Sequence, residues 1–234
     1  MTTDAHADPY AQQREALLAR IEAEAAATER YTGRRAFSPD VMDAVARVPR
    51  HRFVPPWFED EAYLNSPLAI GYGHTISQPF IVALMTDLLE LKPGAAVLEI
   101  GCGSGYQAAV LAELGARVYS IEFVEALALS AQQRLRELGY SSVEARAGDG
   151  YFGWPEHAPF EAVIVTAAAD QIPPPLIEQL KPGGRIVIPV GQPYASQDLV
   201  LLAKQQDGGT RRQSILPVAF VPFLRAPNLL GANS

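Results

Sequence analysis

The sequence contains very little cysteine, which excludes a fold held together by disulfides. Cys102 is the only cysteine among 234 residues, so no internal disulfide can form. A chain without disulfides fits a reducing compartment. Histidine is also scarce, and the histidines are scattered without the spacing of metal ligands, so we expect no metal site. They are His6, His51, His74 and His157.

Long apolar runs and an excess of positive charge are missing as well. No segment approaches the ~18 apolar residues of a membrane span. The net charge of −7 disfavours nucleic acid and anionic membranes as partners. Residues 1–8 are polar and acidic, unlike a secretion signal, so we expect a cytoplasmic protein. Hydrophobic residues make up 48% and charged residues 19%, which is typical of a globular protein.

A chain of 234 residues is long enough to bury a sizeable core in one domain. We divide that single domain into a helical extension over 1–36, a loop and helix region over 37–92, an α/β core over 93–225 and a tail over 226–234. Residues 228–234 are expected to fray.

The centre of the sequence is a strand-like run, Val97–Ile100, that leads into a glycine-rich turn. The glycines are Gly101, Gly103 and Gly105, and a helical stretch follows over 108–114. Glycine lets the backbone turn tightly and approach a ligand closely, and the helix start directs free N–H groups at the same place. This layout predicts a nucleotide-type cofactor site, although such a turn can also be purely structural.

The glycine spacing narrows the choice of cofactor. It is G-x-G-x-G, and Tyr106 stands where the dinucleotide fingerprint has its third glycine. This disfavours NAD and FAD but is compatible with a ligand without phosphate, such as S-adenosylmethionine. Glu122 ends the next predicted strand, 21 positions after Gly101, where a carboxylate can accept both ribose hydroxyls. The alternative for Glu122 is a solvated charge at a strand end.

Further candidate residues follow the next predicted strands. Asp149 is placed to accept from an adenine amino group, or else belongs to an ordinary Asp-Gly turn. Cys102 has two interpretations, a nucleophile or a small residue beneath a ligand, and we favour the second. The predicted cofactor-binding residues are Glu99, Gly101, Gly103, Ser104, Gly105, Glu122, Asp149, Gly150 and Thr166.

The N-terminal part predicts helices separated by irregular segments. A helix is expected over 9–30, and Ser38 followed by proline is typical of the start of a second. Segment 48–55 is too rich in proline for regular structure, and 63–79 is expected to be a long functional loop. A helix over 80–91 follows it, so the hydroxyl of Ser77 has an alternative role as the N-cap.

From residue 92 onward, strands alternate with helices, which predicts an α/β fold. We expect a doubly wound, Rossmann-like sheet that is mostly parallel. An Asp-Gly-Gly turn near the C-terminus predicts a hairpin, so the last strands are antiparallel. The expected strands are 96–100, 118–122, 143–147, 160–167, 185–189, 198–205 and 212–220, and the expected helices are 124–138 and 175–180.

Two stretches together, 72–79 and 97–106, carry a family resemblance. They are Tyr-Gly-His-Thr-Ile-Ser-Gln-Pro and Val-Leu-Glu-Ile-Gly-Cys-Gly-Ser-Gly-Tyr, and the chain resembles protein-L-isoaspartate O-methyltransferases over about 35–225. The glycine stretch is shared by many methyltransferases, whereas Thr-Ile-Ser-Gln-Pro is specific. His74 stands where bacterial members often have Gln. The likeness extends to 52–55, 148–150, 180–185 and 218–224.

The resemblance implies that the α/β sheet is that of a class I methyltransferase. It also implies a repair enzyme that uses S-adenosyl-L-methionine and releases S-adenosyl-L-homocysteine. Such enzymes methylate the free α-carboxylate of L-isoaspartyl residues in damaged proteins and peptides, and the ester closes to a succinimide that can reopen as aspartate. The resemblance assigns catalysis to Ser77 and places Thr75 and Ile76 in the same substrate loop. A monomer is expected.

The chemistry of the acceptor agrees with these residues. A carboxylate with a pKa near 4 is already ionised at pH 7, so no strong base is required. We therefore assign Ser77 a positioning role as a hydrogen-bond donor. Two alternatives remain at this point: an enzyme of the same fold that methylates one dedicated peptide or small molecule, and a non-catalytic module that only binds the cofactor.

Overall fold

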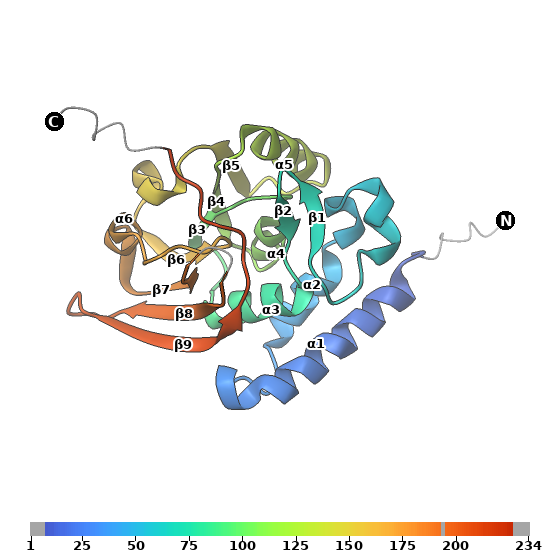
Figure 1. Cartoon of the computed structure of the whole chain (residues 1–234), viewed down its shortest axis with the longest axis horizontal. Coiled ribbons are helices and arrows are strands. Elements are labelled where there is room, and N and C mark those ends of the chain that lie inside the picture. The colour runs from blue at the N-terminus through green and yellow to red at the C-terminus, as the bar shows by residue number, and fades with distance from the viewer. Residues whose placement is uncertain (1–7, 193–194, 227–234) are drawn as a thin grey trace.

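The computed structural model describes residues 8–192 and 195–226, and the predicted frayed end at 228–234 lies outside them. Its centre is a seven-stranded sheet with the order β5-β4-β3-β6-β7-β8-β9, shown in Figure 1. The strands are β3 (Ala96–Ile100), β4 (Arg117–Glu122), β5 (Val143–Ala147), β6 (Phe160–Val165), β7 (Leu180–Val190), β8 (Gln197–Lys204) and β9 (Thr210–Val218).

The sheet changes winding direction beside β3. That strand pairs in parallel with β4 on one side and with β6 on the other. All five residues of β3 are buried, including the carboxyl of Glu99, because both faces of this central parallel strand are covered. The pairs β7–β8 and β8–β9 are antiparallel, as predicted. This doubly wound sheet leaves a crevice at the carboxyl ends of β3 and β6.

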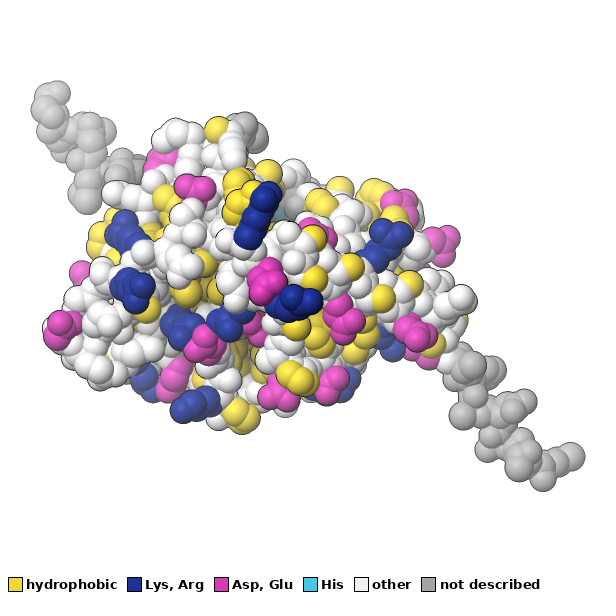
Figure 2. Space-filling model, turned by 90° about the horizontal axis from the view of Figure 1, so that it is seen from below, with side chains coloured by type: hydrophobic (Ala, Val, Ile, Leu, Met, Phe, Trp, Pro, Cys, Tyr) yellow, Lys and Arg dark blue, Asp and Glu magenta, His cyan; other side chains and the backbone are white. Residues whose placement is uncertain are grey.

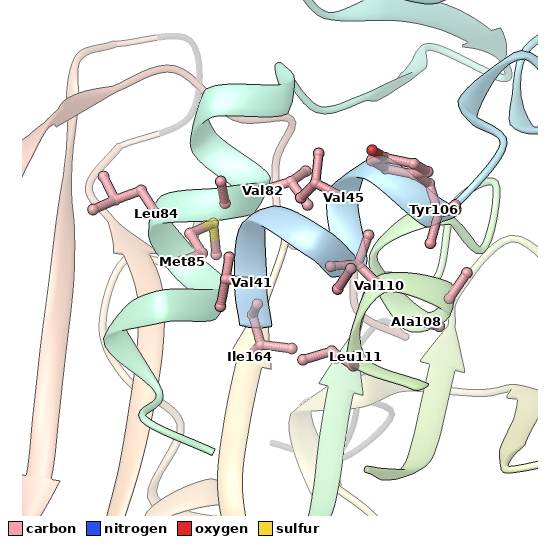
Figure 3. Close-up of a cluster of buried hydrophobic side chains, with 14 of the residues drawn as sticks. Val41, Val45, Val82, Leu84, Met85, Tyr106, Ala108, Val110, Leu111 and Ile164 are labelled. Atoms are coloured by element: carbon pink, nitrogen blue, oxygen red, sulfur yellow. The ribbon is translucent and has the colours of Figure 1, made fainter. Parts of the chain in front are cut away.

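Helices cover the two faces unequally. The larger core joins the sheet to α1–α5, and the smaller core lies beneath α6 and the 3₁₀ turns around it. Figure 3 shows part of the larger core, where side chains from α2, α3 and α4 meet above Ile164 of β6. The helices are α1 (Ala11–Thr32), α2 (Pro39–Arg47), α3 (Pro79–Leu88), α4 (Tyr106–Glu113), α5 (Glu125–Glu137) and α6 (Pro174–Glu178).

The helix starts in the N-terminal region follow from local chemistry. The Ser38 hydroxyl accepts from the N–H of Val41 at 3.4 Å, which confirms the predicted N-cap of α2. Helix α1 ends at Thr32, and its C-cap Gly33 has φ of 67°, the left-handed conformation that favours glycine. Its buried side chains include Leu17 and Ile21, so α1 packs on the larger core.

Two segments predicted to be irregular contain regular elements instead. Segment 48–55 contains the 3₁₀ helix η1 (Arg50–Phe53), and η2 (Pro56–Glu61) follows directly. The fixed φ of proline fits the start of a 3₁₀ turn, so the prolines bound these helices rather than exclude them. Segment 63–79 contains a two-stranded hairpin of β1 (Leu68–Gly71) and β2 (His74–Ile76). Strands this short carry too little alternation to be read from the sequence.

Most element boundaries also differ from prediction by one or two residues, and the largest differences are at α3 and β7. Helix α3 starts at Pro79 and ends at Leu88, three residues before the predicted end, and β7 starts at Leu180, earlier than expected. In the described residues, no helix is both long and apolar enough to cross a membrane. On the face seen from below in Figure 2, acidic and basic side chains are interspersed.

Candidate active site

Three adjoining cavities open at the carboxyl ends of β3, β4 and β6. The first, here the turn cavity, is lined by the glycine turn and the ends of these strands; the second, the loop cavity, is lined by Ser77 and the segment after β9. The third, the junction cavity, touches both Ser77 and the glycine turn. Thr75 and Thr166 line all three cavities. The predicted substrate loop and the predicted cofactor turn therefore meet.

Two glycines of the turn cavity leave no room for a Cβ unless their neighbours shift. Gly101 has φ of 94°, and a Cβ there would lie 2.3 Å from Oγ1 of Thr166. That hydroxyl donates to the carbonyl of Gly101 at 2.6 Å, which ties β3 to the end of β6. At Gly150, a Cβ would lie 2.3 Å from Cγ2 of Ile100. Both positions let the backbone form the cavity wall.

Glu122 supplies the carboxylate at this site. It is the last residue of β4, is only 3% exposed and lines the turn cavity. Its Oε2 accepts from the N–H of Gly103 at 2.8 Å, and its Oε1 accepts from the N–H of Val124 at 2.9 Å. A carboxylate has about four lone-pair positions, so two remain for hydroxyls of a ligand.

The charges around the cavity disfavour a phosphate ligand. No lysine or arginine is among the described residues that line the turn cavity or the junction cavity. A pyrophosphate would lack a cationic partner there, whereas a nucleoside with ribose hydroxyls fits Glu122. Cys102 lines the junction cavity, and burial raises the pKa of its thiol well above the usual value. A neutral thiol is a poor nucleophile, which agrees with the choice of a small residue beneath a ligand.

Three predicted cofactor residues do not line these cavities. Gly105 is the N-cap of α4, and a Cβ there would lie 3.2 Å from Leu135 of α5. Asp149 caps the 3₁₀ helix η3 (Gly150–Phe152) and accepts from the N–H of Tyr151 at 2.9 Å. Its second oxygen accepts from the N–H of Ala226 at 3.2 Å, so the C-terminal segment meets it there.

Glu99, the third of these residues, is fully buried beneath the turn. It accepts a short hydrogen bond from the Ser120 hydroxyl, and its Oε1 has no partner in the described structure. Burial, together with the nearby Glu122 charge, raises its pKa to about 8. Its carboxyl is thus mainly protonated at neutral pH, and the contact from Ser120 ties β3 to β4.

The structure places the other predicted residues around the cavities. Ser104 and Ile76 line the junction cavity, and Ser77 lines both the junction and loop cavities. The alternative that Ser77 caps α3 is wrong, because the N-cap of that helix is Gln78. Ser77 is thus a residue of the cavity walls rather than of a helix start.

Two parts of the cavity walls were not predicted as site residues. Val221–Leu224 lines the turn cavity, anchored where the N–H of Phe223 donates to the carbonyl of Ala168 at 2.8 Å. His74 lines the same cavity, and its Nδ1 lies 2.8 Å from the carbonyl of Tyr72. The segment after β9 has no sequence motif that links it to the glycine turn. It lines the turn cavity because of where β9 lies in the sheet.

Together, the doubly wound sheet, the glycine turn and the buried Glu122 define a Rossmann-like class I methyltransferase. The model of the family Protein-L-isoaspartate(D-aspartate) O-methyltransferase matches residues 24–227. The chain belongs to this family.

Individual relatives agree with the family assignment. Protein-L-isoaspartate O-methyltransferase 2 of Syntrophobacter fumaroxidans is 57% identical, covering 92% of this chain and 87% of its own. Protein-L-isoaspartate O-methyltransferase 1 of Cupriavidus necator is 55% identical, covering 93% and 84%. A solved protein-L-isoaspartate O-methyltransferase has a TM-score of 0.78 at 28% identity, covering 92% of this chain and 67% of its own.

A Plasmodium falciparum structure in complex with S-adenosyl-L-homocysteine has the same fold. Its TM-score is 0.72 at 21% identity, and the match covers 94% of this chain and 100% of that one.

Proposed function

We propose that this protein transfers a methyl group from S-adenosyl-L-methionine to the free α-carboxylate of L-isoaspartyl residues in damaged proteins and peptides. The observation that carries the proposal is the junction cavity, where Ser77 and the glycine turn line one space. A methyl donor on the turn and an acceptor on the loop would meet there. Family membership supports the same reaction.

The residues around the turn cavity suit the proposed cofactor. Glu122 would accept from the ribose hydroxyls, while Gly101, Gly103 and Gly150 leave room for close approach. Thr166 would bound the site on the side of β6. When bound, S-adenosyl-L-methionine supplies an electrophilic methyl group on a sulfonium. The predicted ligand Glu99 would act through the shape of the turn, because its carboxyl lies outside the cavities.

Ser77 would position the acceptor rather than activate it. An α-carboxylate is ionised at pH 7, so no residue has to remove a proton. The Ser77 hydroxyl would donate to one carboxylate oxygen, leaving the other free to approach the donor. Holding two reactants in line can supply about 7–11 kcal/mol of the barrier. All residues of the proposed site come from one chain, in keeping with a monomer.

A matched pair of peptides tests the proposed function. One peptide carries a single isoaspartyl residue, and its twin carries aspartate at the same position. We expect methyl transfer to the first and none to the second, measured with labelled methyl donor. Equal rates on both peptides would contradict repair and favour an enzyme that recognises some other carboxylate.

Ser77→Ala separates acceptor positioning from cofactor binding. Loss of one hydrogen bond to a charged group costs about 1.5–3 kcal/mol, so turnover should fall roughly ten- to hundredfold. The affinity for S-adenosyl-L-homocysteine and the melting temperature should stay at wild-type values. Ser66→Ala is the matched control, because Ser66 lines none of the three cavities. Full turnover by Ser77→Ala would remove Ser77 from the proposed mechanism.

A further inference from the structure

The N-terminal helix α1 reaches the proposed acceptor site through one side chain, Glu24. Its Oε2 accepts from Nδ2 of Asn65 at 2.6 Å and from Nε2 of Gln78 at 3.2 Å, and its Oε1 lies 3.3 Å from the same Gln78 nitrogen. Gln78 follows Ser77 directly and lines the loop cavity. A carboxylate on α1 therefore contacts a wall of the cavity where the acceptor is expected.

Asn65 extends this contact to the start of α3. Its Oδ1 accepts from the N–H of Phe80 at 2.9 Å, one of the helix-start donors that lack a partner within the helix. Asn65 lies just before β1 and Phe80 just after Gln78, so Glu24 joins the two ends of the segment that holds Thr75 and Ser77. Glu24 and Gln78 are both half-buried.

The chemistry of Glu24 sets the orientation of the Gln78 amide. A carboxylate offers only acceptors, so it can bind only the NH₂ end of an amide. The carbonyl end, Oε1 of Gln78, is then directed away from Glu24. Among the described residues, none donates a hydrogen bond to this oxygen.

We propose that Glu24 is a positioning residue that holds the Gln78 amide with its carbonyl oxygen presented to the loop cavity, where it accepts a main-chain N–H of the isoaspartyl substrate. This inference rests on the proposed function. All damaged proteins have main-chain N–H groups, whatever their side chains. An oriented carbonyl oxygen at Gln78 would therefore bind them without preference for particular side chains. Glu24 itself does not touch the reacting atoms.

Glu24→Gln tests the proposal while keeping the side-chain shape. An amide at position 24 can donate as well as accept, so Gln78 loses its single orientation. We expect KM for the isoaspartyl peptide to rise about three- to tenfold, as for one hydrogen bond, with kcat within about twofold of wild type. Glu24→Asp, which keeps the acceptor-only head group, should restore part of the loss. Calorimetric affinity for S-adenosyl-L-homocysteine should not change.

Glu22→Gln is the matched control. Glu22 is exposed on the same helix, carries the same charge and should leave all parameters unchanged. The double variant with Gln78→Ala then shows whether Glu24 acts through Gln78. In the Gln78→Ala background, adding Glu24→Gln should change KM by less than about twofold, because coupled residues are not additive.

The outcomes separate this inference from the proposed function. An unchanged KM in Glu24→Gln, or an equal rise of KM with and without Gln78, would overturn the positioning role alone. A parallel fall of kcat, cofactor affinity and melting temperature would also overturn it, because Glu24 would then only hold α1 in place. A wild-type enzyme that does not methylate the isoaspartyl peptide would overturn the proposed function and this inference with it.

Discussion

The turn cavity is built mostly from strand ends and the turns that follow them, whereas the loop cavity joins segments far apart in the chain. Gly101, Glu122 and Gly150 each lie at or just after the end of a parallel strand. Ser77 instead shares its cavity with Ala195 and Phe220, which follow it by more than a hundred residues. The turn cavity is formed mainly by local backbone geometry, whereas the loop cavity is formed by the packing of whole elements.

The difference extends to the kind of contact that forms each wall. In the turn cavity, Gly101, Gly103 and Gly150 form part of the wall, and Glu122 is held by two backbone donors. In the loop cavity, side chains such as Gln78 form the wall and are oriented by other side chains. A substitution in the turn cavity is therefore expected to change the backbone conformation. A substitution in the loop cavity is expected to change how a neighbouring side chain is oriented.

The largest expected effect comes from Gly101→Ala. A residue with a Cβ at φ of 94° costs about 1–2 kcal/mol, and the new Cβ would lie 2.3 Å from Oγ1 of Thr166. Moving Thr166 breaks its hydrogen bond to the Gly101 carbonyl. We expect the free energy of unfolding to fall by about 2–4 kcal/mol, measured by denaturant unfolding, with weaker binding of S-adenosyl-L-homocysteine.

Gly139→Ala is the matched control for that change. Its φ of 82° is also left-handed, but a Cβ at this position would meet no neighbouring atom within 4 Å, so only the backbone cost applies. If both variants lose the same stability and both keep cofactor affinity, close packing at Gly101 does not shape the turn cavity. The contrast between the two cavities would then be wrong.

A smaller effect is expected from Glu122→Ala. Removing the carboxylate leaves the N–H groups of Gly103 and Val124 without their acceptor and takes away the proposed ribose contact. Affinity for S-adenosyl-L-homocysteine should fall by about 1.5–3 kcal/mol, or roughly ten- to hundredfold, measured by calorimetry. Glu125→Ala, at an exposed position on α5, should leave the affinity unchanged. Wild-type affinity in Glu122→Ala would show that the ribose is held elsewhere.

The smallest effect on cofactor affinity is expected from Glu99→Gln, which sharpens the comparison by separating stability from binding. Glu99 has a pKa of about 8 in the folded protein, raised by burial from 4.5. Because the folded state holds this proton more tightly, Glu99 favours folding at low pH, and this contribution is lost as pH rises from about 4.5 to 8. The slope approaches roughly 1.4 kcal/mol per pH unit at its steepest.

The glutamine variant should lack this pH dependence. Its stability relative to wild type should therefore rise between about pH 5 and pH 8, measured by unfolding at several pH values. Its affinity for S-adenosyl-L-homocysteine should match wild type, since Glu99 does not line the turn cavity. A stability difference that is independent of pH would mean that Glu99 is not protonated in the folded protein.

Much of the fold could be predicted from particular stretches. The run Val97–Ile100 and its glycine turn predict β3 and the start of α4, because a buried strand and a tight turn have strong local signatures. The hairpin of β1 and β2 was missed, because its register depends on Tyr72 and two glycines with positive φ rather than on alternation. The position of the Glu99 side chain was also not predictable, since the sequence shows an acid near the turn but not the direction in which its carboxyl points.

By itself, the sequence determined the alternation of strands and helices, the glycine turn and the acid at the end of β4, because each rests on interactions among neighbouring residues. Only the tertiary structure decided that Ser77 meets the glycine turn, that Val221–Leu224 closes one wall, and that Glu24 reaches Gln78. These contacts join segments far apart in the chain, and their geometry depends on how the sheet and helices pack rather than on any local pattern.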